Sequence, residues 1–139
     1  MQPAVVVVED NDFDVKRIER GFKKLGQDPT IYRARDGVEA LALLRGETQQ
    51  VPPTPPLVIL LDLNMPRMGG IEFLDELRGD RNLRKLPVFV VTTSEFERDI
   101  ELAHERNVCG YIAKPRSSEE MADILKTLSD FWQTCHFSP

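Results

Sequence analysis

Short runs of apolar residues alternate along the chain with longer segments in which apolar residues recur every three or four positions. Three runs are continuous, Val5–Val8, Leu57–Leu61 and Val88–Val91, which is typical of strands buried on both faces of a sheet. The segment after the first run has helical spacing, with apolar residues on one face: Val15, Ile18, Phe22 and Leu25. Strands that alternate with amphipathic helices predict an α/β fold with a parallel sheet.

The rest of the chain continues this alternation. Thr30–Ala34 and the weaker Val108–Ala113 are interpreted as further strands. A second helix is indicated by apolar residues at helical spacing: Val38, Leu41 and Leu44. The segment Gly46–Pro56 differs, because its prolines cannot continue a helix or a central strand. We interpret it as a stiff surface connector, with a contact to a partner as the alternative.

Acidic residues stand directly after two of the buried strands. Asp62 follows Leu57–Leu61, and Glu9 and Asp10 follow Val5–Val8. A single carboxylate at such a position could simply cap a turn or a helix. Three carboxylates at two strand ends, however, are not a capping pattern. If the strands are neighbours in a parallel sheet, the carboxylates meet in one pocket, where a divalent cation would relieve their repulsion. The ligands are oxygens only, which favours Mg²⁺.

Two further strand ends carry groups that suit a phosphoryl group. Val88–Val91 is followed by Thr92, and Val108–Ala113 by Lys114 and Pro115. An ammonium group neutralises phosphate oxygens, and a hydroxyl group donates hydrogen bonds to them. Each residue alone has a simpler explanation, as a strand threonine or a solvated surface lysine. Their order along the chain, after the acid pair and the single Asp, favours a phosphoryl site.

This ordered set of motifs resembles the receiver domain of bacterial response regulators. The matching segments are Glu9-Asp10, DLNMP with Asp62, the glycines 69 and 70, PVFVVT ending in Thr92, and YIAKP with Tyr111 and Lys114. The resemblance covers about the whole chain, so residues 1–139 are interpreted as one receiver domain with a carboxyl-terminal helix over about residues 117–135. It implies a flavodoxin-like (βα)5 doubly wound parallel sheet with strand order 2-1-3-4-5, whose switch point holds the carboxylates.

The resemblance implies that a sensor histidine kinase transfers a phosphoryl group to Asp62. Asp10, Asp62 and the backbone carbonyl of Asn64 would hold Mg²⁺ directly. Glu9, which stands where many receivers have Asp, would reach the ion through water. Receivers catalyse only their own phosphorylation and dephosphorylation, so we expect no other enzymatic activity.

Three further residues have roles that the resemblance implies. Thr92 and Lys114 would bind the phosphoryl oxygens, and a cis bond between Lys114 and Pro115 would aim the lysine into the site. After phosphorylation Thr92 would move towards the phosphoryl group, and Tyr111 would turn into the space that Thr92 leaves. The alternative for Tyr111 is an amphipathic strand residue with no part in switching.

A narrower resemblance is to single-domain regulators that partner phytochrome-type kinases. It depends on the LRGDRNLRKLPV stretch, on the Phe131-Trp132 ending and on the expectation that no output domain is attached. Apolar residues of the last helix cover more than one stripe: Met121, Ile124, Leu125, Leu128, Phe131, Trp132 and Cys135. Either Phe131 and Trp132 fold over the domain's own core, or they anchor a homodimer through the fourth helix, fifth strand and fifth helix. The resemblance favours the dimer.

Composition agrees with a small cytoplasmic domain. The 139 residues carry 18 basic and 23 acidic side chains, a net charge of -5, without a basic run, so we expect no nucleic-acid partner. We also expect no signal peptide, no membrane span and no membrane partner. Cys109 and Cys135 fit no metal-binding spacing and are expected to be reduced thiols. His104 and His136 are isolated, which favours surface or packing roles.

Two other classes of protein share part of this pattern. A phosphatase with an aspartate nucleophile needs a second Asp two residues after the first, where this chain has Asn64. A pseudo-receiver binds partners without phosphorylation. It would not need the complete set of the acid pair, Asp62, Thr92 and Lys114 that this chain has. Asp12 and Asp14, at the start of the first helix, suit the helix dipole, and replacing either with Asn is expected to leave phosphorylation largely intact.

Overall fold

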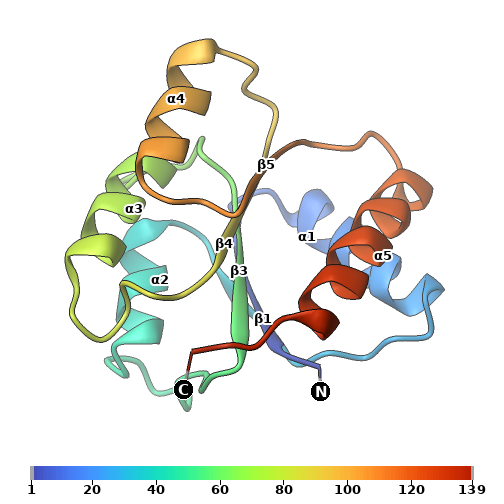
Figure 1. Cartoon of the computed structure of the whole chain (residues 1–139), viewed down its shortest axis with the longest axis horizontal. Coiled ribbons are helices and arrows are strands. Elements are labelled where there is room, and N and C mark those ends of the chain that lie inside the picture. Colours follow the sequence, from blue (N-terminus) through green and yellow to red (C-terminus); the bar gives the residue numbers. More distant parts are fainter. Residues whose placement is uncertain (1, 139) are drawn as a thin grey trace.

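The computed structural model describes residues 2–138, in which five strands alternate with five helices (Figure 1). In chain order these are β1 (Ala4–Val8), α1 (Asp12–Lys24), β2 (Ile31–Ala34), α2 (Gly37–Leu44), β3 (Leu57–Leu61), α3 (Gly70–Gly79), β4 (Val88–Thr92), α4 (Glu97–Glu105), β5 (Gly110–Ala113) and α5 (Ser118–Thr134). The predicted alternation is present throughout, although β5 begins later than the expected Val108.

The strands are parallel and lie in the order β2-β1-β3-β4-β5. This confirms the flavodoxin-like strand order that the resemblance implied. The register aligns the ends of neighbouring strands, since Val8 pairs with Leu61 and Thr92 pairs with Ala113. The residues that follow the strands therefore lie along one edge of the sheet.

Helices cover both faces of the sheet (Figure 1). α1 and α5 pack against each other on one face, and α2, α3 and α4 form a row on the other. Alternate residues of β1 enter two separate apolar clusters, with Val5 and Val7 in one and Val6 and Val8 in the other. Burial on both faces explains why the central strands are continuous apolar runs.

The two predicted helical faces differ in how well they match the structure. In α1 the predicted residues contact the core: Val15, Ile18 and Phe22. In α2, however, Val38 is 41% exposed. The buried face of this helix consists of other residues: Gly37, Ala40, Leu41 and Leu43. The helix has only 8 residues, little more than two turns, so its apolar spacing did not fix which side faces the sheet.

The end of α5 packs on the sheet beside α1. Trp132 is 2% exposed, and its ring centroid lies 6.5 Å from that of Phe22 and 6.2 Å from that of Phe89. Phe131 meets Phe89 edge-on at 6.4 Å and remains 54% exposed. Trp132 thus belongs to the chain's own core, whereas Phe131 presents its ring to solvent.

The proline-rich connector between α2 and β3 lies at the edge of the sheet opposite the strand ends (Figure 1). Most of its residues are exposed, but Pro53 is buried, and the Pro56 carbonyl accepts a hydrogen bond from the Ala4 N–H at 3.0 Å. These contacts agree with a surface connector that is fixed at its end. Within residues 2–138, no helix has the length and apolar character needed to cross a membrane.

Candidate functional site

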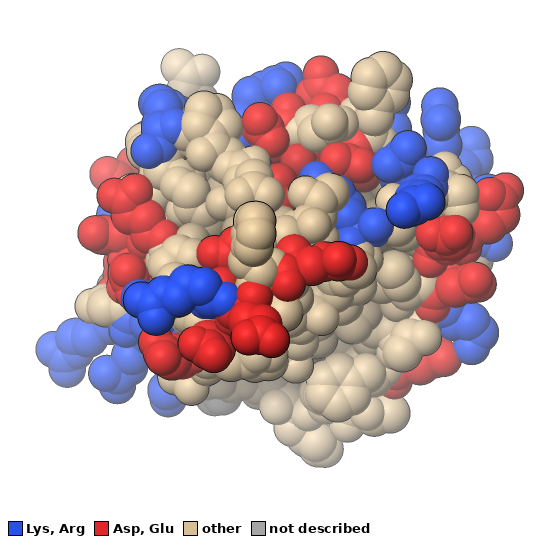
Figure 2. All heavy atoms as spheres, turned by 90° about the horizontal axis from the view of Figure 1, so that it is seen from above, with Lys and Arg blue, Asp and Glu red and all other residues tan. Residues whose placement is uncertain are grey.

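Three carboxylates meet at the edge where β1 and β3 end. One oxygen from each of Glu9, Asp10 and Asp62 lies within 4.8 Å of the others. Glu9 and Asp62 are only 4% and 5% exposed, whereas Asp10 is exposed. Figure 2 looks onto this edge, where acidic side chains gather across the middle of the surface. The structure thus brings together the three acids at the ends of the two strands.

Burial of these charges has an electrostatic cost. Loss of water raises the pKa of Glu9 to about 7, from 4.5. A hydrogen bond from Lys114 opposes the rise, the charge of Asp62 adds to it, and a hydrogen bond from the Asn11 backbone N–H, 3.0 Å long, also opposes it. A divalent cation would relieve this cost, and the surrounding oxygens are of the kind that Mg²⁺ binds.

Asp62 has one free oxygen at the centre of the site. Its Oδ2 atom lies 3.5 Å from Lys114 Nζ, but its Oδ1 atom is buried and has no hydrogen-bond partner within residues 2–138. The Asp62 backbone N–H continues the sheet by donating to the Val8 carbonyl at 3.0 Å. An unpartnered buried polar atom costs about 1–3 kcal/mol. The free oxygen is therefore placed to bind a cation or to attack an electrophile.

The start of α3 lies directly against the backbone of Asp62. A Cβ atom at Gly70 would come within 2.8 Å of the Asp62 carbonyl oxygen and 2.7 Å of Leu63 Cα. A side chain at position 70 would push the helix away from the loop that carries Asp62. This glycine of the GG motif therefore has a steric role beside the site. Asn64, in the same loop, is exposed, and its backbone carbonyl stays a predicted metal ligand.

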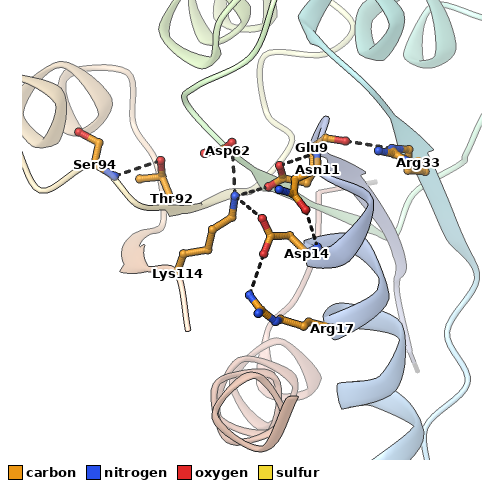
Figure 3. A network of polar contacts seen from close by, with 9 residues as sticks. All are labelled: Glu9, Asn11, Asp14, Arg17, Arg33, Asp62, Thr92, Ser94 and Lys114. Carbon is orange, nitrogen blue, oxygen red and sulfur yellow. Dashed lines mark hydrogen bonds and ion pairs between the residues drawn. The ribbon is translucent and has the colours of Figure 1, made fainter. Parts of the chain in front are cut away.

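Lys114 reaches the site from the end of β5 and contacts three carboxylates (Figure 3). Its Nζ atom lies 2.7 Å from Asp14 Oδ2, 2.9 Å from Glu9 Oε2 and 3.5 Å from Asp62 Oδ2. Burial alone would lower the pKa of the ammonium group, but hydrogen bonds to Asp14 and Glu9 outweigh burial and raise the pKa above its usual value. The lysine is therefore a permanent cation in this pocket.

The bond between Lys114 and Pro115 is trans, and the prediction of a cis bond there was wrong. In the described part of the chain, only Pro55–Pro56 is cis. The Lys114 N–H donates to the Thr92 carbonyl at 2.9 Å, which continues the pairing of β5 with β4. From this extended backbone the long side chain already reaches the acids, so its direction does not depend on a cis bond.

Asp14 belongs to the site, although its position in the sequence suggested only a role at the helix dipole. It is 7% exposed, and Oδ1 accepts a hydrogen bond from Arg17 at 3.1 Å. Asp12 is exposed instead and pairs with Arg33 and Arg35. Helical residues two apart point to different sides because each residue turns the chain by about 100°. This spacing, with α1 placed beside the strand ends, was a signal that could have separated the two aspartates.

Thr92 and Tyr111 are connected through the loop after β4. Thr92 is fully buried, and its hydroxyl oxygen accepts a long hydrogen bond, 3.4 Å, from the Ser94 N–H. The Ser94 carbonyl accepts a hydrogen bond from the Tyr111 hydroxyl at 2.8 Å, and the Ser94 hydroxyl donates to Asp99 of α4. Tyr111 is half-buried, so Ser94 contacts both predicted switch residues and the next helix.

The model of the response regulator receiver domain matches residues 5–126. The chain therefore belongs to the response regulator receiver domain family. The response regulator Rcp1 of Synechocystis sp. is 31% identical over 128 residues, which are 92% of this chain and 87% of Rcp1. The probable methanogenesis regulatory protein FilR2 of Methanothrix harundinacea is 33% identical over 138 residues, which are 97% of this chain and 86% of FilR2.

Solved structures give the same result at the level of the fold. The phosphorylated cyanobacterial phytochrome response regulator RcpA superposes with a TM-score of 0.89 at 32% identity, and all of both chains is covered. The Mn²⁺-bound form of Rcp1 superposes with a TM-score of 0.85 at 30% identity over 99% of each chain. These similarities confirm the narrower resemblance to phytochrome-associated, single-domain regulators.

Proposed function

We propose that the protein is the phosphoacceptor of a two-component signalling system and receives a phosphoryl group from a histidine kinase on Asp62. The observation that carries the proposal is the Asp62 Oδ1 atom, which is buried and unpartnered in residues 2–138 and lies at the acid cluster beside Lys114. The alternative, a pseudo-receiver that only binds partners, gives no reason to keep this oxygen free.

The chemistry follows from the positions of the side chains. Asp62 attacks the phosphorus of a phosphohistidine, so that a P–O bond forms while the P–N bond breaks and the histidine nitrogen leaves. Lys114 neutralises charge on the transferred group, and the Thr92 hydroxyl donates a hydrogen bond to one of its oxygens. Little covalent assistance is needed, because phosphoryl transfer depends mainly on position and charge.

The residues at the strand ends fit a divalent cation, which we propose is Mg²⁺. Asp10, Asp62 and the backbone carbonyl of Asn64 would hold the ion, with Glu9 behind a water molecule. A bound ion supplies positive charge against the charge that develops on the phosphoryl oxygens. Support comes from the close approach of the three carboxylates and from the relative Rcp1, of which a Mn²⁺-bound form is known.

The partner that this function requires is a sensor histidine kinase, and we propose one of the phytochrome type. Two similar structures support this choice: RcpA is a phytochrome response regulator, and RPA3017 belongs to red light signalling of R. palustris. RPA3017 is 28% identical to this chain with a TM-score of 0.88. We place the protein in the cytoplasm, where the phosphohistidine of such a kinase is available.

Phosphorylation would change the surface through Thr92 and Tyr111. If the Thr92 hydroxyl turns towards the phosphoryl group, its long hydrogen bond from the Ser94 N–H is lost. The loop after β4 is then free to shift, and the Tyr111 hydroxyl, which donates to the Ser94 carbonyl, is affected with it. Because the Ser94 hydroxyl also binds Asp99, this shift would reach α4. We therefore propose these residues as the switch.

We further propose a homodimer through α4, β5 and α5. Within residues 2–138, β5 is an edge strand that pairs only with β4, and the exposed Phe131 lines a pocket together with Cys109, the residue before β5. Trp132, also expected at this interface, is buried in its own chain. Trp132 would stabilise the interface indirectly, from the core of its own chain. Phe131 would be the aromatic residue that contacts the partner.

Replacement Asp62→Asn should abolish phosphorylation, because an amide is not a nucleophile for this reaction. The measurement is intact mass after incubation with acetyl phosphate and Mg²⁺, and the parent should gain one phosphoryl group per chain. Asp12→Asn is the matched control, since it removes the same charge from an exposed residue, and it should be labelled like the parent. A labelled Asp62→Asn protein would contradict the assignment.

The same experiment separates the other classes of protein. Release of many equivalents of phosphate per chain, without a stable adduct, would indicate a phosphatase, which Asn64 in place of a second Asp speaks against. Neither an adduct nor phosphate release, with acetyl phosphate and with a histidine kinase, would indicate a pseudo-receiver.

A further inference from the structure

The ammonium group of Lys114 is shared unequally among the acids around it. It lies 2.7 Å from Asp14, closer than its 3.5 Å separation from Asp62. Figure 3 shows the ammonium group beside Glu9 and Asp14, with Asp62 above it. In this state the lysine is therefore paired mainly with acids other than the phosphoacceptor.

Asp14 is held firmly in its place. Its backbone N–H donates to Asn11 Oδ1 at 3.1 Å within the first turn of α1, and its carboxylate is bound by Arg17 through Oδ1 and by Lys114 through Oδ2. The residue is 7% exposed. The Asp14 carboxylate is fixed, so it stays in place when the lysine side chain moves. It is therefore a binding position for the ammonium group away from Asp62.

We propose that Asp14 is a positioning residue, which holds Lys114 away from Asp62 until a phosphoryl group arrives there. The inference rests on the proposed function of Asp62. A phosphoryl oxygen on Asp62 must compete with Asp14 for the same ammonium group. Asp14 thus weakens the hold of the pocket on an anion, while its negative charge strengthens the hold on a cation.

This role predicts changes of opposite sign for the two kinds of ligand. Asp14→Asn should weaken Mg²⁺ binding by about two- to fivefold and should tighten binding of beryllofluoride, a phosphoryl analogue, by about three- to tenfold. A residue that merely supports the fold would, when replaced, weaken both. The opposite signs therefore distinguish positioning from structural support.

The experiment is calorimetric titration of the full chain, with Mg²⁺ alone and with beryllofluoride at saturating Mg²⁺. Asp12→Asn is the matched control, because Asp12 lies in the same helical turn, carries the same charge and pairs with arginines on the surface. It should change both dissociation constants by less than about twofold. Asp14→Glu keeps the charge and should restore values near those of the parent. Thermal melting checks that each variant is folded.

A second measurement tests the link to the lysine itself. Without Asp14, the Lys114 ammonium group loses its shortest contact, so its amine should react about three- to tenfold faster with acetic anhydride, as read from peptide masses. Unchanged reactivity of Lys114 in Asp14→Asn would overturn the inference. Changes of the same sign for both ligands, or equal changes in Asp12→Asn, would overturn it too.

The outcomes also separate this inference from the proposed function. If the parent takes a phosphoryl group and binds beryllofluoride, but Asp14→Asn binds both ligands as the parent does, only the role of Asp14 is wrong. If the parent binds Mg²⁺ but neither accepts a phosphoryl group nor binds beryllofluoride, the proposed function is wrong, and the role of Asp14 is wrong with it.

Discussion

Glu9 and Asp62 keep their carboxylates close together where little water reaches them. Asp10 adds a third negative charge and Asp14 a fourth, whereas in residues 2–138 two cations contact this cluster: Lys114 directly at its centre and Arg17 through Asp14. Like charges at such distances repel, and burial adds to the cost. At the scale of single residues, the site therefore lowers the stability of the metal-free protein.

Removal of one of these charges should stabilise the metal-free protein. Glu9→Gln keeps the size of the side chain and an acceptor for Lys114, and we expect it to raise the free energy of unfolding in EDTA by about 1–2 kcal/mol, or about 3 °C of Tm for each kcal/mol. Millimolar Mg²⁺ should raise the Tm of the parent more than that of the variant. Thermal melts with EDTA and with Mg²⁺ measure both effects, and identical curves for the two proteins would contradict a shared pocket.

At the scale of elements, α2 is joined to the loop after β3 by one buried carboxylate. Asp36 caps α2 by accepting a hydrogen bond from the Glu39 N–H at 2.9 Å, and its other oxygen binds Arg67 at 2.7 Å. Burial alone would raise the pKa of Asp36, but the bonds from Arg67 and from the helix outweigh burial and hold the pKa below its usual value. The pair thus fixes the loop that begins at Asp62.

This pair should make stability depend on pH at the acid end. A lowered pKa means that the contribution is complete above the unfolded value, 3.8, and is lost as the pH falls through the lower folded value. Asp36→Asn keeps the cap but loses the ion pair, so the parent should be more stable by about 0.5–1 kcal/mol at pH 5 to 7. Urea unfolding should show this gap shrink as the pH falls below 3.8; a gap that is constant down to about pH 2 would exclude the ion pair as its source.

The order of elements and the acids at strand ends could be predicted because both are local features of the chain. A buried strand is a continuous apolar run, and its end is visible where Leu61 is followed by Asp62. The direction of a side chain on a short helix is not local, because it depends on what the helix packs against. For this reason the exposure of Val38 on the short helix α2 came only from the structure, as did the packing of α1 that turns Asp14 towards Lys114. For Trp132 the sequence left two alternatives, its own core or a dimer interface, and the structure places it in the core.

At the scale of the whole molecule, the two aromatic residues at the end of α5 should have separate effects. Trp132→Ala removes a buried ring and should cost about 3–5 kcal/mol of stability, whereas Phe131→Ala, at an exposed position, should cost less than about 1 kcal/mol. If the proposed dimer forms, Phe131→Ala should weaken it and leave phosphorylation intact. Urea unfolding and sedimentation at tens of micromolar measure the two effects. A parent that sediments as a monomer, with and without phosphorylation, would exclude the dimer.

Asp62 Oδ1 is the only buried carboxylate oxygen in residues 2–138 that lacks a hydrogen-bond partner, so a local conflict in the fold lies at the atom that the proposed function makes the phosphoacceptor. Under the proposed function, a cation that binds there with the phosphoryl group would remove the conflict, so activation would also make the native state more stable. Proteases, which cleave chains that open transiently, would then degrade the active form more slowly than the resting form. The strength of the signal would in this way also set the lifetime of the protein that carries it.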